Sequence, residues 1–336
     1  MIPSPFTHLL AMSTAIGTFE HAELTKPRVD GGFCTDDMAR VLIAVSREPE
    51  PSAAVLRLGH VAQQFLADAQ APSGAFRNRR SATGQWEDEA TLEDCWGRSL
   101  WAFGTAARFA PDQAQRAAAQ SCFELGARLR SPWPRSMAFA ALGAADVIAA
   151  HPDNAPARSL LEDAVVAIGS PAESEDWPWP QPRLSYANAV LPEALIAAGV
   201  ALQRPQPIAD GLRLLRWLLA RETVDGHLSP TPVGGAGPGD SASRFDQQPI
   251  EVAAMADACL RACTVDPDGP WLTGIERAAA WFAGDNDTGT PMQDPGSGGG
   301  FDGLTATGAN RNCGAESTLA LLSTLQVAAR CGSAAG

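Results

Sequence analysis

Acidic side chains stand at the predicted starts of several buried helices, and they are the groups in the sequence best suited to chemistry. Asp36-Asp37 and Glu93-Asp94 each precede an apolar run, as do single acids further along the chain. Cleavage of a glycosidic bond needs one carboxyl that holds a proton and another that is ionised. We predict that the catalytic carboxyls are drawn from Asp37, Asp94, Glu251 and Glu316.

Amides, aromatic rings and arginines accompany these acids. Sugar hydroxyls bind acids and amides, the apolar face of a sugar stacks on Trp or Tyr, and arginines neutralise nearby carboxylates. Two acids close together also raise one pKa, which is how a general acid arises at neutral pH. The predicted substrate-binding residues are His21, Asp36, Arg40, Glu93, Trp96, Arg98, Trp179, Tyr186, Asn188, His227, Arg244, Asp246, Gln247, Gln248, Asp302, Asn310 and Asn312.

Each of these polar groups also has a purely structural interpretation. Asp36 and Glu93 are ordinary first-turn residues that cap a helix and meet its positive dipole end. Trp96 and Trp179 are equally suited to core packing, and a lone histidine is more often structural than catalytic. The convergence of many such groups on helix starts favours a common pocket.

The elements that must position these residues are predicted to be helical throughout, because strand patterns are weak and Ala- and Leu-rich helical periodicity recurs. Long connections enter, and short connections leave, every second helix except near residues 131–135. Six antiparallel hairpins in a ring, an all-α (α/α)6 toroid, explain this alternation, with a superhelical repeat as the competing architecture. The predicted helices are 5–17, 35–47, 52–71, 91–110, 112–129, 132–150, 155–169, 188–202, 206–221, 249–264, 270–283 and 314–331.

Composition narrows the class of protein. The 336 residues are 45% hydrophobic and 19% charged, as in a globular protein with a large core. A net charge of −13 argues against nucleic acid and anionic membranes, and no apolar run is long enough to span a bilayer. The first residues lack signal-peptide character, so we expect a cytoplasmic protein. Neither the seven cysteines, the five histidines nor the glycine runs match a metal or nucleotide motif, so no metal and no cofactor is predicted.

A series of motifs follows in order along the chain, at residues 17–22, 32–40, 93–94 with 97–98, 191–194, 226–227, 244–251, 284–287, 301–304 and 310–318. Together they resemble the bacterial six-hairpin, glycosidase-like toroid domains that are often associated with glycosyltransferase-type proteins. The resemblance runs from about His8 to Ala328, and it departs from the family pattern at Ala187, usually acidic, and Cys313, usually Gln. It implies a single toroid domain over residues 1–336 and a glycosyltransferase or mannoside-processing enzyme as a partner.

Three functions are consistent with this sequence. The leading hypothesis is a glycoside hydrolase that acts on an oligosaccharide. The second is a sugar epimerase or isomerase on the same scaffold, with His21 and His227 as the proton-transfer groups. The third is a carbohydrate-binding partner of a glycosyltransferase that performs no chemistry.

Overall fold

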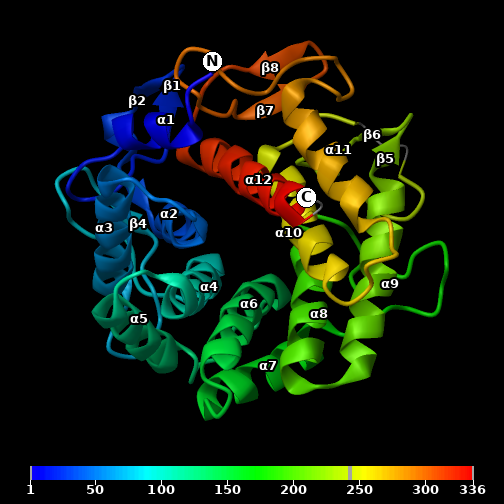
Figure 1. The fold of residues 1–336 in the computed structure, drawn as a ribbon, viewed down its shortest axis with the longest axis horizontal. Coiled ribbons are helices and arrows are strands. Elements are labelled where there is room, and N and C mark those ends of the chain that lie inside the picture. The colour runs from blue at the N-terminus through cyan, green and yellow to red at the C-terminus, as the bar shows by residue number, and fades with distance from the viewer. Residues whose placement is uncertain (1, 241–243, 335–336) are drawn as a thin grey trace.

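A computed structural model describes residues 2–240 and 244–334, and within them the chain forms twelve α-helices (Figure 1). Six helices form an inner ring, and six pack outside it. The inner helices are α2 (Thr35–Arg47), α4 (Asp94–Phe109), α6 (Pro134–Ala150), α8 (Val190–Leu202), α10 (Pro249–Cys263) and α12 (Ala315–Ala334). The outer helices are α1 (Pro5–Ala11), α3 (Ala53–Ala69), α5 (Gln113–Gly126), α7 (Ala155–Ile168), α9 (Pro205–Arg221) and α11 (Trp271–Ala283).

The inner helices close into a ring. Each packs on the next in chain order, and α12 packs back on α2 (Figure 1). Each outer helix packs against the inner helix that precedes it, and α1 packs on α12. The predicted (α/α)6 toroid is therefore confirmed, and the superhelical alternative is excluded because its ends would not meet.

The predicted helix boundaries agree closely with the structure except in α1. The prediction extended this helix to residue 17, whereas it ends at Ala11. Ser13 donates to the carbonyl of Leu9 and is hydrogen-bonded to Thr18, while the Thr14 hydroxyl accepts from the backbone of Ile16. These local side-chain bonds offer the backbone an alternative to the helical ladder.

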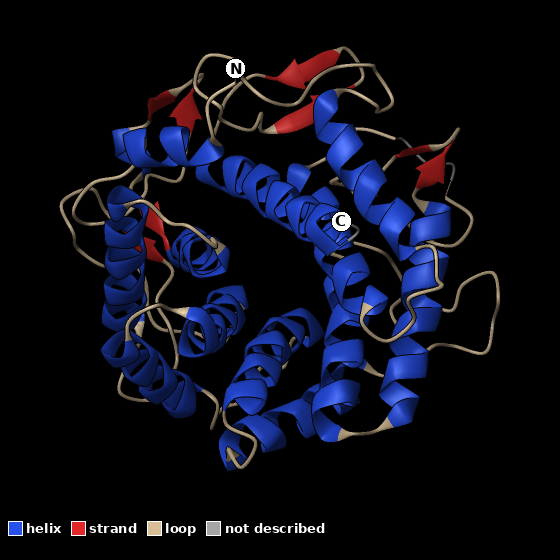
Figure 2. Ribbon diagram, viewed as in Figure 1, coloured by secondary structure: helices blue, strands red, loops and turns tan. Residues whose placement is uncertain are grey.

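The long connections run from outer to inner helices, so they gather at the end of the ring where the inner helices begin. All the strands that the structure describes lie in them, paired as four two-stranded antiparallel sheets (Figure 2). The connection between α5 and α6, residues 127–133, contains none. The strands are β1 (Ala22–Glu23), β2 (Lys26–Pro27), β3 (Phe33–Cys34), β4 (Arg79–Arg80), β5 (Thr223–Val224), β6 (His227–Leu228), β7 (Gly303–Thr305) and β8 (Gly308–Asn310).

Several of these connections are joined to one another by backbone pairing. Strand β3, before α2, pairs with β4, before α4. Leu184, before α8, pairs with Ala236, before α10, and Gln247 pairs with Leu304, before α12. The connections therefore form a continuous rim around most of the ring mouth.

Helices α4 and α6 approach closely because glycines face backbone at their crossing. A Cβ atom added at Gly143 would lie 2.1 Å from the carbonyl oxygen of Leu100, and one added at Gly104 would lie 2.2 Å from that of Gly143. No real Cβ tolerates such contacts, so the spacing of these two inner helices requires glycine. This packing places the first turns of α4 and α6 side by side at the mouth.

Among the described residues, no helix combines the length and apolar character that crossing a bilayer requires.

Candidate active site

A cavity of about 470 Å³ opens at the end of the ring where the inner helices begin. Five of the inner helices, or the segments just before them, contribute most of its walls, and the rim connections supply the rest. Its lining consists of Glu20, His21, Cys34, Asp36, Asp37, Arg40, Asp94, Arg98, Tyr186, Gln248, Asp302, Asn310, Gly314, Glu316 and Ser317. We call this the mouth cavity.

One guanidinium connects two acids across the wall between α2 and α12. Arg40 donates from Nη1 to Oδ1 of Asp37 over 2.6 Å and from Nη2 to Oε2 of Glu316 over 2.5 Å. The Asp37 side chain is only 2% exposed, whereas that of Glu316 is 44% exposed. Two carboxyls of very different solvent access are thus fixed beside each other.

A second guanidinium connects two further acids. Nε of Arg98 lies 3.4 Å from Oδ1 of Asp36, and its Nη2 lies 3.7 Å from Oδ2 of Asp94. The spacing of Arg40 and Arg98 behind Asp37 and Asp94 puts each arginine on the same helix face as its acid. The mouth cavity therefore contains two acid–arginine–acid groups.

Burial makes Asp37 the acid in the cavity with the most altered proton affinity. Burial raises the pKa of Asp37 to about 7 against the lowering effect of Arg40, and the negative charges of Glu316 and Glu20 raise it further. The thiol of Cys34 donates to Oδ2 of Asp37 over 3.2 Å. Burial also raises the pKa of Asp36. Asp37 can therefore hold or release a proton near neutral pH.

The opposite side of the mouth cavity pairs an acid with an aromatic ring. The Tyr186 hydroxyl donates to Asp94, which also accepts a 3.0 Å hydrogen bond from Ser136. Burial, reinforced by the charge of Asp94, raises the pKa of Tyr186 to about 12, so the phenol stays a donor. The Arg135 guanidinium lies 4.9 Å from the centre of the Tyr186 ring. The ring is thus fixed in place with one face toward Arg135.

Glu20 lines the mouth cavity but was not among the predicted site residues. It lies in the connection before α2, away from any helix start, where the pattern of acids gave no signal. Its carboxylate is ion-paired with Arg79, and one of its oxygens lies within 4.8 Å of the Cys34 sulfur and of an Asp37 carboxyl oxygen.

Glu20, Cys34 and Asp37 are the set in this cavity that has metal-ligand spacing. The residues do not fit a metal well, because a thiol must be deprotonated to bind one and burial raises the pKa of Cys34 far above its usual range. Both carboxylates are also already paired with arginines. We therefore assign no metal to this set.

The predicted site residues divide into two groups. Those that line the mouth cavity are His21, Asp36, Asp37, Arg40, Asp94, Arg98, Tyr186, Gln248, Asp302, Asn310 and Glu316. Asp302 also caps α12, since its Oδ1 accepts from the backbone of Gly314 and the hydroxyl of Ser317. Glu93 lines a neighbouring cavity with Asp94. The remaining predicted residues do not line the mouth cavity.

Glu251, predicted as catalytic, is buried and fully engaged with the backbone before α8. Its Oε1 accepts from the amide of Ala187 over 2.5 Å, and its Oε2 accepts from the amide and side chain of Asn188. Burial raises the pKa of Glu251 to about 8. We therefore infer that Glu251 positions residues 187–188, and its predicted catalytic role stays a prediction.

Both predicted tryptophans, Trp96 and Trp179, are buried in the core and do not line the mouth cavity. Trp96 is fully buried, and its indole donates to the carbonyl of Gly126. Trp179 stacks on Trp217. Asn188 is likewise buried, where it accepts from Arg135. Nothing in the neighbouring sequence indicated that these side chains turn inward.

His227 and its neighbours form a separate polar network around Asp287. His227 Nε2 lies 3.4 Å from this carboxylate, which also accepts from Arg244 and Gln247. Asp246 is exposed outside the mouth cavity. The described lining thus contains one histidine, His21, because His227 is held by Asp287. Asn312 lies outside the lining too, and its Oδ1 accepts from the amide of Leu24.

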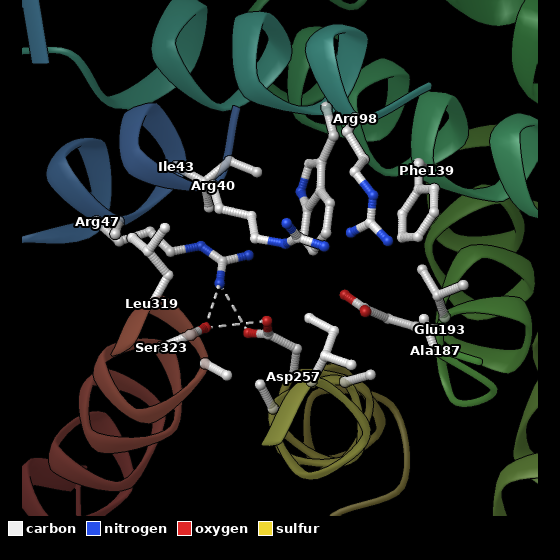
Figure 3. Close-up of a pocket in the computed structure, with 17 residues that line it drawn as sticks. Arg40, Ile43, Arg47, Arg98, Phe139, Ala187, Glu193, Asp257, Leu319 and Ser323 are labelled. Carbon is white, nitrogen blue, oxygen red and sulfur yellow. Dashed lines mark hydrogen bonds and ion pairs between the residues drawn. The ribbon is translucent and has the colours of Figure 1, made fainter. Parts of the chain in front are cut away.

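Below the mouth cavity, a smaller cavity of about 50 Å³ lies between the inner helices (Figure 3). Arg40 and Arg98 reach toward each other at its edge and line both cavities. Deeper in the ring, Arg47 donates to Asp257 over 2.8 Å. Arg40 and Arg98 therefore form the floor of the mouth cavity.

No protein-family model and no curated protein matches this sequence. A sugar epimerase from a ruminal bacterium has a similar structure, with a TM-score of 0.73, 11% identity and coverage of 97% of this chain and 95% of that one. The cellobiose 2-epimerase of Spirochaeta thermophila DSM 6192 is similar with a TM-score of 0.72 and 13% identity, over 99% of this chain and 95% of that one. The GH76 α-mannanase of Bacteroides thetaiotaomicron is similar with a TM-score of 0.64 and 11% identity, over 98% of this chain and 95% of that one. These similarities show a fold shared with several sugar-processing enzymes.

Proposed function

We propose that this protein is a glycoside hydrolase that acts on an oligosaccharide by carboxylate acid and base catalysis in the mouth cavity. One observation carries the proposal: Arg40 holds a buried acid with a pKa of about 7, Asp37, beside an exposed acid, Glu316. Hydrolysis of a glycosidic bond requires two carboxyls in different protonation states. The similar structures, which include a mannanase and an amylase, support a sugar as substrate.

The different environments of these acids suggest a division of roles. Asp37 donates its proton to the glycosidic oxygen as the bond to the leaving sugar breaks. Glu316, paired with Arg40, accepts a proton from the attacking water. Proton exchange with solvent then restores both groups. Asp94 and Tyr186, on the other side of the cavity, bind sugar hydroxyls.

The charge of the lining favours an uncharged sugar. Six carboxyl residues but two arginines line the described part of the mouth cavity. An anionic sugar would meet more negative than positive groups, so its binding would cost Coulomb energy. The six carboxyl residues are Glu20, Asp36, Asp37, Asp94, Asp302 and Glu316.

Epimerisation is less well supported by the same geometry. The hypothesis of two histidines acting on one sugar needs both rings at the cavity, whereas His227 faces Asp287 and His21 alone is in the described lining. The abundance of carboxyls and the scarcity of histidines there favour hydrolysis.

The decisive experiment compares Asp37→Asn and Glu316→Gln with the wild type on cello- and manno-oligosaccharides. We expect each substitution to lower kcat/KM by about 100-fold or more, the usual contribution of a general acid or base. Glu162→Gln is the matched control, because Glu162 is an exposed acid of the outer helix α7 that is paired with Arg204. This substitution should leave kcat/KM unchanged. Sugar release that survives both active-site substitutions would refute the proposal, as would epimerisation of these sugars without cleavage.

A further inference from the structure

A second cavity, of about 500 Å³, adjoins the mouth cavity on the side of α6. The two cavities share Asp94 and Tyr186, which therefore stand at their boundary. The remaining lining of the second cavity is Glu93, Trp133, Pro134, Arg135 and Gln181. A ligand in the mouth cavity can thus continue into this space without leaving the protein surface.

The second cavity lies beside the shortest of the connections that form the rim. The connection between α5 and α6, residues 127–133, is shorter than the other five connections that enter inner helices. Its residues belong to no strand and to no isolated β-bridge, whereas each of the other five connections has a residue in one or the other. Trp133 and Pro134 come from the end of this connection and the start of α6, so the second cavity is bounded there by the shortest of the six connections.

Two aromatic side chains are left exposed along this path. Trp133 is 58% exposed and Tyr186 is 42% exposed. Among the described rings, none stacks on Trp133, so its indole faces have no aromatic partner. An exposed indole next to a cavity with polar groups is typical of a carbohydrate-binding surface, since the apolar face of a sugar packs on a flat ring.

The floor of the second cavity is held rigidly by Arg135. This residue is 8% exposed, and its guanidinium donates to the Tyr186 carbonyl over 2.5 Å, to the Gln181 amide over 3.0 Å and to Asn188 over 3.0 Å. These bonds fix the segment that carries Tyr186. The cavity is therefore built before any ligand arrives, which lowers the entropic cost of binding.

We propose that the second cavity is a sugar-binding subsite that takes an uncharged sugar unit next to the one in the mouth cavity, with Trp133 as its stacking platform. The substrate is then an oligosaccharide of at least two units that lies across Tyr186 and Asp94. Glu93 and Gln181 provide acceptors and donors for its hydroxyls. The inference rests on the proposed function for the identity of the ligand in the mouth cavity.

The test measures binding by calorimetry, independently of hydrolysis. Cello- and manno-oligosaccharides of one to four units are titrated into the Glu316→Gln protein, with and without Trp133→Ala. We expect affinity to rise about tenfold from the monosaccharide to the disaccharide or trisaccharide, as expected when roughly 60 Å² of apolar surface is buried. Trp133→Ala should remove this gain and leave monosaccharide binding unchanged.

Two further variants make the result specific to the ring. Trp133→Phe, which keeps a stacking surface, should retain most of the gain with chain length. Phe109→Ala removes an exposed aromatic side chain outside both cavities and should change nothing.

Affinity that does not depend on chain length, a gain that survives Trp133→Ala, or a lack of binding by all these sugars would overturn the subsite. A gain that depends on Trp133 in a protein that never cleaves sugars would refute the proposed hydrolase and leave the subsite standing. Cleavage of these sugars without any gain in affinity with chain length would support the proposed hydrolase and refute the subsite.

Discussion

Cys34 contacts the Asp37 carboxyl and the first turn of α2 at the same time. Its sulfur accepts from the Asp37 amide over 3.4 Å, and its thiol donates to Oδ2 of Asp37 over 3.2 Å. The second bond stabilises the ionised carboxylate and so lowers the pKa of Asp37 against the effect of burial. The thiol therefore tunes the pKa of this acid.

This contact leads to a prediction for the pH dependence of activity. If Asp37 is the general acid, kcat/KM falls as pH rises through about 7, because the proton is lost. Cys34→Ala removes a donor to the carboxylate, so the pKa of Asp37 rises and the fall in activity moves to higher pH. Profiles of kcat/KM between pH 5 and 9 measure this shift. Cys34→Ser, which keeps a donor, should stay close to the wild type, and a downward shift in Cys34→Ala would contradict the assignment.

Some site residues followed from the sequence and others did not. Acids at inner-helix starts, such as Asp37 and Glu316, line the mouth cavity because the ring gathers these starts at one end. Glu251 has the same sequence signature, yet its carboxylate binds the backbone of Ala187. A position in a first turn does not fix which way the side chain points. Glu20 was missed because its place beside Cys34 depends on contacts distant in sequence, such as the ion pair with Arg79.

At the scale of elements, the crossing of α4 and α6 is the most sensitive to side-chain size. A Cβ at Gly143 would meet backbone atoms of Leu100, which cannot rotate away. We expect Gly143→Ala to destabilise the protein by about 1–3 kcal/mol, the usual cost of overpacking a core. Chemical denaturation measures this change in the free energy of unfolding.

The control for this substitution is Gly234→Ala. Nothing lies within 4 Å of a Cβ built at Gly234, so this variant should unfold like the wild type. Equal stability of the Gly143 and Gly234 variants would show that the two helices can separate at little cost.

The helices themselves were predictable because their apolar periodicity and their caps are local signals. Asp112 and Asn154, for example, accept from backbone amides of the first turns of α5 and α7, as cap residues do. The rim strands were not predicted, since each is only two or three residues long and one pair, β3 with β4, joins two separate connections. The end of α1 was missed for the opposite reason, because local hydroxyl bonds overrode a helical pattern.

At the scale of the whole molecule, buried acids couple stability to pH. Burial raises the pKa of Glu222 to about 7, although hydrogen bonds from Thr231 lower it. The charge of Glu222 in turn raises the pKa of Glu251. A group whose pKa is higher in the folded than in the unfolded state contributes stability below its unfolded pKa of about 4.5, and that contribution is lost as pH rises.

We therefore expect the melting temperature to fall as pH rises from about 5 to 8, and Glu222→Gln to reduce this fall. The amide oxygen can still accept the two bonds that Thr231 donates to one oxygen of Glu222. Calorimetric scans across this pH range compare the two proteins. A variant whose melting temperature depends on pH as steeply as that of the wild type would contradict the role of Glu222. Glu162→Gln again serves as the exposed control.

The ring as a whole could be predicted from the alternation of long and short connections, because that alternation reflects which end of each hairpin faces the mouth. The reaction could not be predicted in the same way. Epimerases and a mannanase share this fold at 13% identity or less, so the architecture alone does not select among them. What selects is the set of side chains that line the mouth cavity.

The paired rim connections also have a consequence for how this protein can be altered. Because β3 pairs with β4, and Gln247 with Leu304, an insertion in one of these segments would shift the register of its partner and disturb two walls at once. Engineered loop exchanges should therefore move paired connections together, as a unit. The unpaired connection at residues 127–133 is the place where a single graft can redesign the entrance.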